Sequence, residues 1–254
     1  MHWAAGGKLD GPPIVFANSL GTDFRIWDGV IAHLNPRYRT VTYDKRGHGL
    51  SEATPGPYSI DTLATDVLAL ADAQGLKRFA LVGLSVGGLI AQAVAIRAPE
   101  RLSALVLCDT ASRIWTAGQW AVRIMAVEAE GLDKIADGIV KTWVTEAYRA
   151  TRSDELLGWR NMLTRQPTIG YLAMCGVLRD TDLSTQAPGI KTPTLAIAGA
   201  EDASTTPAMV KASSDRIPGS RFEVIQGAAH LPCLEQPAAL AHLIDRHISE
   251  IAHG

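Results

Sequence analysis

The chain has 254 residues, of which 47% are hydrophobic and 20% are charged, and its formal net charge is −2. This length and apolar content suffice for one globular unit with a substantial core, and the charge gives no basic field for nucleic acid. No stretch is long and apolar enough to cross a bilayer, and the N-terminus lacks the regions of a signal peptide. Cys108, Cys175 and Cys233 are widely spaced and form no metal-binding pair. We therefore expect a cytoplasmic protein with reduced thiols and no metal, nucleic-acid or membrane partner. The sequence leaves open whether the protein forms a homo-oligomer.

Apolar runs that favour strands alternate along the chain with helical patterns. The expected strands are Pro13 to Ala17, Tyr38 to Tyr43, Phe79 to Leu84, Leu102 to Cys108, Pro193 to Gly199 and Arg221 to Gln226. Helical patterns lie between them, such as Ile26 to Leu34 and a helix that Ser59 caps and Gly75 stops. From Leu240 to Ile251, apolar residues recur with helical spacing. Apolar strands with helices on both faces predict an α/β fold, built on a mostly parallel doubly wound sheet.

The region from about residue 114 to 181 breaks this alternation. It contains only helical patterns and polar turns, and it holds four of the six tryptophans, Trp115, Trp120, Trp143 and Trp159. Ligands of open α/β sheets bind at the carboxyl ends of the strands, so a helical insertion placed there is predicted to cap a site. We expect a core formed by residues 1–112 and 182–254, with a helical cap over residues 113–181.

The pentapeptide Gly83-Leu84-Ser85-Val86-Gly87 lies between an expected strand and a helical pattern. In that setting a G-x-S-x-G pattern indicates a nucleophile elbow, a strained turn that exposes the serine hydroxyl above the sheet. The two glycines are expected because a side chain at either position would collide with neighbouring segments. The alternative interpretation is a glycine-rich turn in which the serine only caps the helix.

A serine nucleophile needs a base within hydrogen-bond reach and an acid that orients the base. After such an elbow the acid precedes the histidine in the chain, and Asp202 and His230 follow Ser85 in that order. Each comes directly after one of the last two expected strands. Asp109, at the end of an earlier strand, is the alternative acid, and His48, on a loop ahead of the nucleophile, is the alternative base.

Attack on a carbonyl creates an oxyanion that needs two preorganised backbone donors. The Val86 amide lies in the first turn of the helix, where unpaired N–H groups and the helix dipole favour negative charge. The loop after the first expected strand reads Asn18-Ser19-Leu20-Gly21-Thr22-Asp23 and nominates the Leu20 amide as the second donor.

These motifs resemble those of the α/β-hydrolase superfamily, and over nearly its whole length the chain is similar to the 3-oxoadipate enol-lactonases. The general features are the elbow, the run from residue 43 to 49, and the positions of Asp202 and His230; the narrower ones are segments 18–23 with Trp27, 109–114 and 171–183. The resemblance implies Ser85, Asp202 and His230 as a catalytic triad, for a hydrolysis that uses water and no cofactor. Lys45 and Val86 depart from the family pattern, and neither departure threatens the chemistry.

The resemblance also implies a small-molecule substrate, an enol-lactone that carries a carboxylate. Its leaving group is an enolate, which is much less basic than an alkoxide, so His230 need not deliver a proton early. An arginine in an apolar, tryptophan-lined pocket suits the carboxylate, because its planar fork binds a carboxylate through two hydrogen bonds. Arg113 is the first candidate and Arg179 the second, and Trp143 is the candidate for a pocket wall.

Other interpretations use the same residues. A general carboxylesterase, or a hydrolase of carbon–carbon bonds in ring-cleavage products, needs the same triad, and a non-catalytic ligand receptor retains it while signalling through the cap. A dehalogenase or epoxide hydrolase is disfavoured because each needs aspartate in place of Ser85. For Arg113 and Arg179 the alternative is a surface charge or an ion pair, and for Trp143 it is a plain core position.

Overall fold

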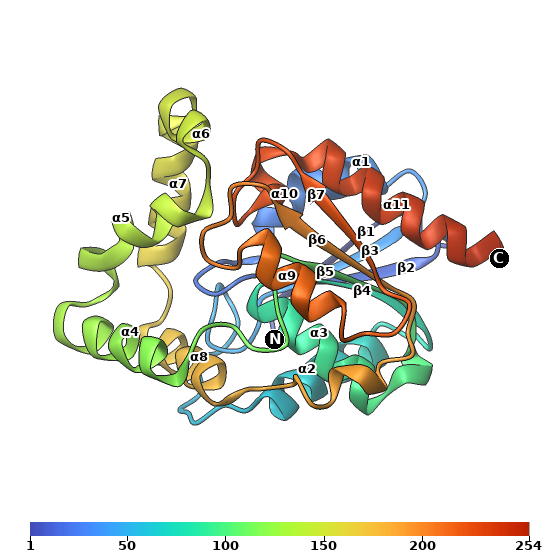
Figure 1. Cartoon of the computed structure of the whole chain (residues 1–254), viewed down its shortest axis with the longest axis horizontal. Coiled ribbons are helices and arrows are strands. Elements are labelled where there is room, and N and C mark those ends of the chain that lie inside the picture. The colour runs from blue at the N-terminus through green and yellow to red at the C-terminus, as the bar shows by residue number, and fades with distance from the viewer. Residues whose placement is uncertain (254) are drawn as a thin grey trace.

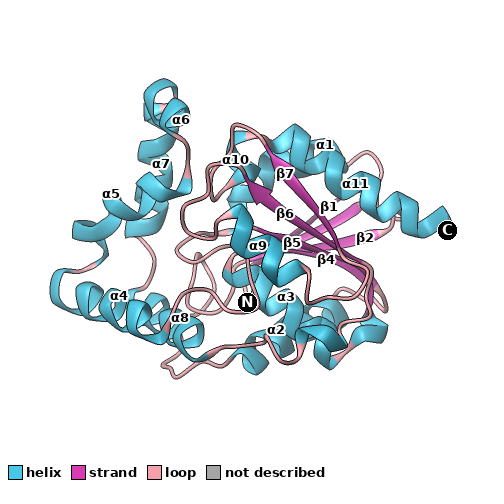
Figure 2. Ribbon diagram, viewed as in Figure 1, coloured by secondary structure: helices cyan, strands magenta, loops and turns pink. Residues whose placement is uncertain are grey.

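The computed structural model describes residues 1–253, which form one seven-stranded sheet with helices on both faces (Figure 1, Figure 2). The strands are β1 (Trp3–Gly7), β2 (Pro13–Ala17), β3 (Arg39–Tyr43), β4 (Phe79–Leu84), β5 (Leu102–Cys108), β6 (Thr194–Gly199) and β7 (Arg221–Ile225). Their spatial order is β1-β3-β2-β4-β5-β6-β7. β1 is antiparallel to β3, and the other neighbouring pairs are parallel. The predicted mostly parallel, doubly wound sheet is confirmed.

Two layers of helices bury the central strands, and every residue of β4 and β6 is buried. On one face α1 (Asp28–Leu34) packs beside α11 (Pro237–His253), and on the other lie α2 (Ile60–Ala73), α3 (Val86–Arg97) and α9 (Pro207–Ser214) (Figure 1). Short helical turns occur at Phe24–Trp27, Pro99–Arg101, Ala187–Gly189 and in α10 (Pro232–Glu235). Burial on both faces explains why the central strands are recognisable as continuous apolar runs.

The first strand, β1, was not predicted from the sequence. Its residues Trp-Ala-Ala-Gly-Gly are all exposed, so no apolar alternation marks them, and glycine and alanine have low strand propensity. The strand is defined by its antiparallel register with β3, from Trp3 opposite Tyr43 to Gly7 opposite Arg39. Such pairing joins segments that are distant in the sequence, and a local pattern does not reveal it.

Five helices are inserted between β5 and β6, as predicted, and they lie on the left of Figure 1 as a layer beside the sheet. They are α4 (Ala117–Glu130), α5 (Leu132–Trp143), α6 (Glu146–Thr151), α7 (Ser153–Thr164) and α8 (Thr168–Asp180). Thr116 and Gln119 form a capping box that starts α4. The exact bounds of the cap, 113 and 181, stay a prediction. Between residues 1 and 253, no helix has both the length and the apolar character needed to span a bilayer.

Candidate active site

Ser85 lies in the sharp turn between β4 and α3. Its backbone adopts φ 57° and ψ −119°, a conformation that residues with a side chain rarely adopt. A Cβ atom at Gly83 would collide with the carbonyl of Gly87, and one at Gly87 would collide with the carbonyl of Ala17. The Thr110 hydroxyl donates a 2.7 Å hydrogen bond to the Ser85 carbonyl. The turn therefore has the strained geometry and the obligatory glycines that its sequence pattern predicts.

His230 and Asp202 meet on the loops that follow β7 and β6. Nδ1 of His230 is 2.8 Å from Oδ2 of Asp202, and both side chains are buried. Oδ1 of Asp202 accepts hydrogen bonds from the amides of Ser204 (2.7 Å) and Thr205 (3.1 Å), and the Thr205 hydroxyl donates to Oδ2 at 2.6 Å. Burial raises the pKa of Asp202, but the charge of His230 and these hydrogen bonds together outweigh burial and lower it. A carboxylate held against Nδ1 in this way orients the imidazole so that Nε2 can accept a proton.

Asp109, the alternative acid, lies nearby in a different environment. Its Oδ1 accepts a 2.7 Å hydrogen bond from the Gly199 amide, whereas its Oδ2 has no hydrogen-bond partner among the described residues. Burial, and next the charge of Asp202, raise the pKa of Asp109 well above its ordinary value. The carboxylate that accepts a hydrogen bond from His230 is that of Asp202, so the geometry favours Asp202 as the acid.

The two backbone amides predicted to be oxyanion donors, those of Val86 and Leu20, lie close to Ser85. The Val86 amide opens α3, and Leu20 lines the same pocket as Ser85. Within the described part of the chain, neither amide donates a hydrogen bond to a protein group, so both are free to bind an anion. His48, the alternative base, is buried under the Leu20 loop, where its Nε2 accepts a 3.1 Å hydrogen bond from the Gly21 amide.

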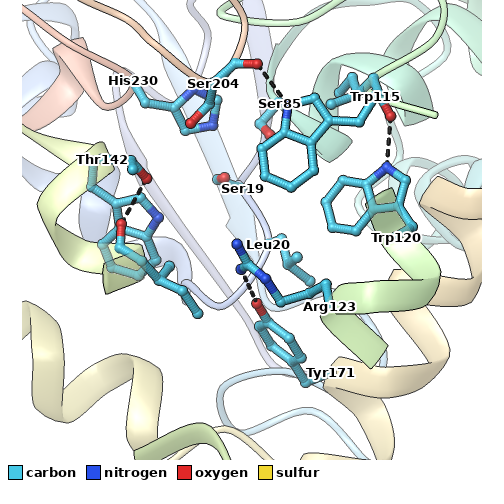
Figure 3. A pocket seen from close by; sticks show the side chains of 13 residues that line it. Ser19, Leu20, Ser85, Trp115, Trp120, Arg123, Thr142, Tyr171, Ser204 and His230 are labelled. Atoms are coloured by element: carbon cyan, nitrogen blue, oxygen red, sulfur yellow. Dashed lines mark hydrogen bonds between the residues drawn. The ribbon is translucent and has the colours of Figure 1, made fainter. Parts of the chain in front are cut away.

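The pocket above Ser85 lies between the core and the cap (Figure 3). Core loops contribute Ser19, Leu20, Ser85, Ser204 and His230. The cap region contributes Ile114 and Trp115, which precede α4, and Trp120, Arg123, Ile139, Thr142, Trp143 and Tyr171 on its helices. Trp143 lines this pocket, and its carbonyl accepts a 2.8 Å hydrogen bond from the Leu231 amide beside His230. Within residues 1–253, no group of three or more His, Cys, Asp or Glu side chains is arranged to hold a metal ion.

The structure does not bring Arg113 or Arg179 into this pocket. Arg113 forms a 3.2 Å ion pair with Asp182, and both side chains are close to half exposed. Arg179 lies in the last turn of α8 and pairs with its neighbour Asp180 at 2.7 Å. Both arginines point into solvent because the loop before α4 and the end of α8 lie at the surface. They match the alternative interpretation, a surface charge in an ion pair.

The arginine that does line the pocket is Arg123 on α4, which the sequence interpretation missed. Its Nη1 donates a 3.3 Å hydrogen bond to the Tyr171 hydroxyl, and its guanidinium carbon lies 5.6 Å from the centre of the Trp115 ring. Figure 3 shows its side chain pointing into the pocket. In the described residues no carboxylate pairs with it. The signal was present in the sequence, because Trp120, Arg123 and Val127 share one helical face whose two apolar members are buried.

The fold and the site define a class of protein. A family model described as the alpha/beta hydrolase fold matches residues 12–237, and the chain belongs to that family. The predicted membership is thereby confirmed.

Within that class the chain is similar to enol-lactonases. It is 35% identical to 3-oxoadipate enol-lactonase 2 of Acinetobacter baylyi, over 96% of this chain and 91% of that protein. The crystal structure of the enol-lactonase from Burkholderia xenovorans superimposes with a TM-score of 0.95 at 35% identity, covering 98% of this chain and 96% of that chain. A thermophilic esterase from Thermogutta terrifontis matches with a TM-score of 0.91 at 28% identity, over 98% and 93% of the two chains.

Proposed function

We propose that this protein opens the ring of 3-oxoadipate enol-lactone to give 3-oxoadipate, with Ser85 as nucleophile, His230 as base and Asp202 as the acid that orients it. The observation that carries the proposal is one pocket in which Ser85 and His230 face an unpaired arginine, Arg123. Its tryptophan and isoleucine side chains suit a small ring, and the guanidinium of Arg123 suits a substrate carboxylate. The 35% identity to an enol-lactonase over nearly the full length supports the same substrate.

The proposed reaction proceeds through an acyl-enzyme. His230 accepts the proton of Ser85 as the hydroxyl oxygen attacks the lactone carbonyl, and the carbonyl electron pair moves onto oxygen, where the Leu20 and Val86 amides stabilise it. Collapse of this intermediate breaks the ring C–O bond and releases the enolate oxygen, which takes up a proton and tautomerises to a ketone. The ring oxygen is then no longer a nucleophile, so the ring does not close again. Water activated by His230 releases the keto-acid from Ser85.

We propose that Arg123 binds the substrate carboxylate, the role predicted for Arg113 from the sequence. The guanidinium is a planar donor that fits a carboxylate, and the Tyr171 hydroxyl and the Trp115 ring hold it in place from two sides. An arginine that is half-buried and has no carboxylate partner in the described chain retains donors for a ligand. Trp143, which lines the same pocket, limits the shape of the ring that fits.

The proposed function is tested by following enol-lactone loss in the ultraviolet with the purified protein. A p-nitrophenyl ester and a vinylogous diketone are assayed in parallel, and we expect the enol-lactone to have the highest kcat/KM of the three. A preference for the simple ester would assign the protein to the general carboxylesterases, and a preference for the diketone to the carbon–carbon bond hydrolases. Negligible turnover of all three, with ligand binding retained, would favour the receptor.

Replacing Arg123 with methionine should raise KM for the carboxylated lactone. Loss of a charge-assisted hydrogen bond costs about 1.5–3 kcal/mol, which corresponds to roughly a 10- to 150-fold change. KM for an uncharged p-nitrophenyl ester should change by less than about threefold, because that substrate has no carboxylate to lose. Steady-state kinetics on both substrates measure the difference.

The matched control is Arg113→Met, which removes a cation of the same type from an exposed ion pair. Such pairs contribute about 0–1 kcal/mol, so both KM values should remain close to those of the unaltered enzyme. The opposite result, with KM for the lactone raised in the Arg113 variant and unchanged in the Arg123 variant, would return the role to Arg113.

A further inference from the structure

Lys45 is a buried cation that the proposed mechanism does not use. It follows β3, only 1% of its surface is exposed, and no carboxylate in the described chain lies within ion-pair distance of it. Its Nζ instead donates hydrogen bonds to two backbone carbonyls, those of Ser19 (2.5 Å) and Thr22 (3.3 Å). Burying an ammonium without a counter-charge is costly. The positive charge of Lys45 therefore acts mainly on the two backbone carbonyls that accept its hydrogen bonds.

The Ser19 carbonyl belongs to the same peptide unit as the Leu20 amide. In a planar trans peptide the C=O and N–H bonds point in opposite directions. Lys45 therefore donates to one end of a dipole whose other end is the proposed oxyanion donor. The Thr22 hydroxyl donates to the same carbonyl at 2.9 Å. Hydrogen bonds that run in a chain polarise one another, so these two donors make the Leu20 N–H a stronger donor.

The rest of the Leu20 loop is fixed at both of its sides. His48 accepts a 3.1 Å hydrogen bond from the Gly21 amide. The Asn18 side-chain amide donates one hydrogen bond to the Thr22 carbonyl (2.5 Å) and one to the Thr22 hydroxyl (3.1 Å). Together with Lys45, these contacts hold the residues on both sides of the Leu20 N–H. A donor held in place before the reaction needs no reorganisation when the oxyanion forms.

We propose that Lys45 is a positioning residue for the oxyanion hole, and that its ammonium orients and polarises the Ser19–Leu20 peptide so that the Leu20 N–H binds the oxyanion more strongly. This inference rests on the oxyanion role proposed above for Leu20. Its consequence is confined to charged intermediates, because a neutral ground state gains little from a stronger donor.

The ionisation of Lys45 gives this role a pH dependence. Burial lowers the pKa of Lys45 to about 7, although the carboxylates of Asp44 and Asp23 act in the opposite direction. Those carboxylates are themselves paired, Asp44 with His2 at 2.7 Å and Asp23 with Arg25 at 2.6 Å.

Among the described residues, His48 is a further titratable group whose pKa the charge of Lys45 affects. Burial, and next the charge of Lys45, hold the pKa of His48 well below its ordinary value. As the pH rises through the pKa of Lys45, the ammonium becomes a neutral amine. The polarisation of the Leu20 peptide should then weaken on the alkaline side.

The test measures hydrolysis of p-nitrophenyl acetate by the unaltered enzyme and by a Lys45→Met variant. Methionine replaces the lysine with an apolar side chain of similar length. Because removal of a whole oxyanion donor costs about 10²- to 10³-fold in kcat, weakening one donor should lower kcat about 10- to 100-fold at pH 6 with KM nearly unchanged. The unaltered enzyme should lose activity on the alkaline side, and the variant should lack that loss. A matched Lys77→Met control, which removes an exposed lysine, should leave kcat unchanged.

Two further measurements separate polarisation from a merely structural role. The first uses a trifluoromethyl ketone, to which Ser85 adds by forming one C–O bond, leaving the electron pair on the ketone oxygen and giving its proton to His230. In the Lys45→Met variant, affinity for this ketone should fall by the same factor as kcat, while affinity for a product-like keto-acid should not fall. In the unaltered enzyme, the ¹⁵N shift of the Leu20 amide should titrate with the alkaline loss of activity. The NMR measurement decides the question even if the variant does not fold.

The proposal is overturned if kcat of a folded Lys45→Met variant stays within about twofold at pH 6. It is also overturned if ketone and keto-acid affinities fall equally, or if the Leu20 amide shift does not change with pH. These outcomes are independent of the lactone. A protein that cleaves p-nitrophenyl acetate through Ser85 but leaves the enol-lactone intact contradicts the proposed function, and the ester assays still decide the role of Lys45.

Discussion

Replacing Ser85 with alanine is expected to lower kcat for the enol-lactone by about 10⁴- to 10⁶-fold, because loss of a serine nucleophile removes the covalent route. The amides of Leu20 and Val86 and the pocket remain, so KM should change little. Ultraviolet assays of the lactone measure the loss. Mass spectrometry after treatment with a fluorophosphonate should show one adduct on the unaltered protein and none on the variant. Activity above about 1% of the unaltered level would remove Ser85 from the mechanism.

The matched variant is Ser85→Gly, which should be equally inactive but more stable than Ser85→Ala. The backbone at φ 57° and ψ −119° costs a residue with a side chain about 1–3 kcal/mol, and glycine adopts it freely. Glycine also loses about 0.5–1 kcal/mol of additional entropy on folding, so the net gain should be about 1 kcal/mol. Thermal unfolding of the two variants measures it. Equal stability would show that the turn is not strained.

Much of the fold is predictable because burial leaves a local record in the sequence. The strand that ends at Leu84 is buried at all six residues and appears as an apolar run, and the elbow after it needs glycine at two fixed positions. Ser59 caps α2 through a hydrogen bond from the Thr62 amide at 3.1 Å, as its residue type indicates. Each of these features is marked by residue types within a few positions of one another, even where the group that requires the residue is distant, as the Ala17 carbonyl is from Gly87.

The residues that the sequence did not locate depend on non-local contacts. Arg113 and Arg123 are both near the start of the cap, and only the path of the chain after β5 decides which of them turns inward. Tyr171, which holds the Arg123 guanidinium, comes from a helix 48 residues further along the chain. The peptide contact of Lys45 likewise spans 26 residues. Patterns of residue type identify chemistry at strand ends, but they do not determine how the cap folds over them.

Replacing Asp202 with asparagine is expected to lower kcat by about 10⁴-fold. The two backbone amides of Ser204 and Thr205 both donate to Oδ1, so the asparagine carbonyl oxygen should occupy that position. The asparagine NH₂ group then faces Nδ1 of His230 and makes this nitrogen an acceptor. The proton of the neutral imidazole moves to Nε2, which can no longer accept the Ser85 proton. Steady-state kinetics measure the loss, and ¹⁵N spectra of His230 report the change of tautomer.

Asp109→Asn is the matched control, because it makes the same substitution at the neighbouring buried carboxyl. Burial and the neighbouring charge of Asp202 raise the pKa of Asp109 and so favour its uncharged form, which an amide resembles. The asparagine oxygen can still accept from the Gly199 amide, and kcat should change by less than about threefold. If the Asp109 variant instead loses activity and the Asp202 variant retains it, the acid belongs at the end of β5. The pair of variants thus tests which of two adjacent buried carboxyls carries the negative charge, and the hydrogen bonds of Asp202 are the reason that we assign the charge to it.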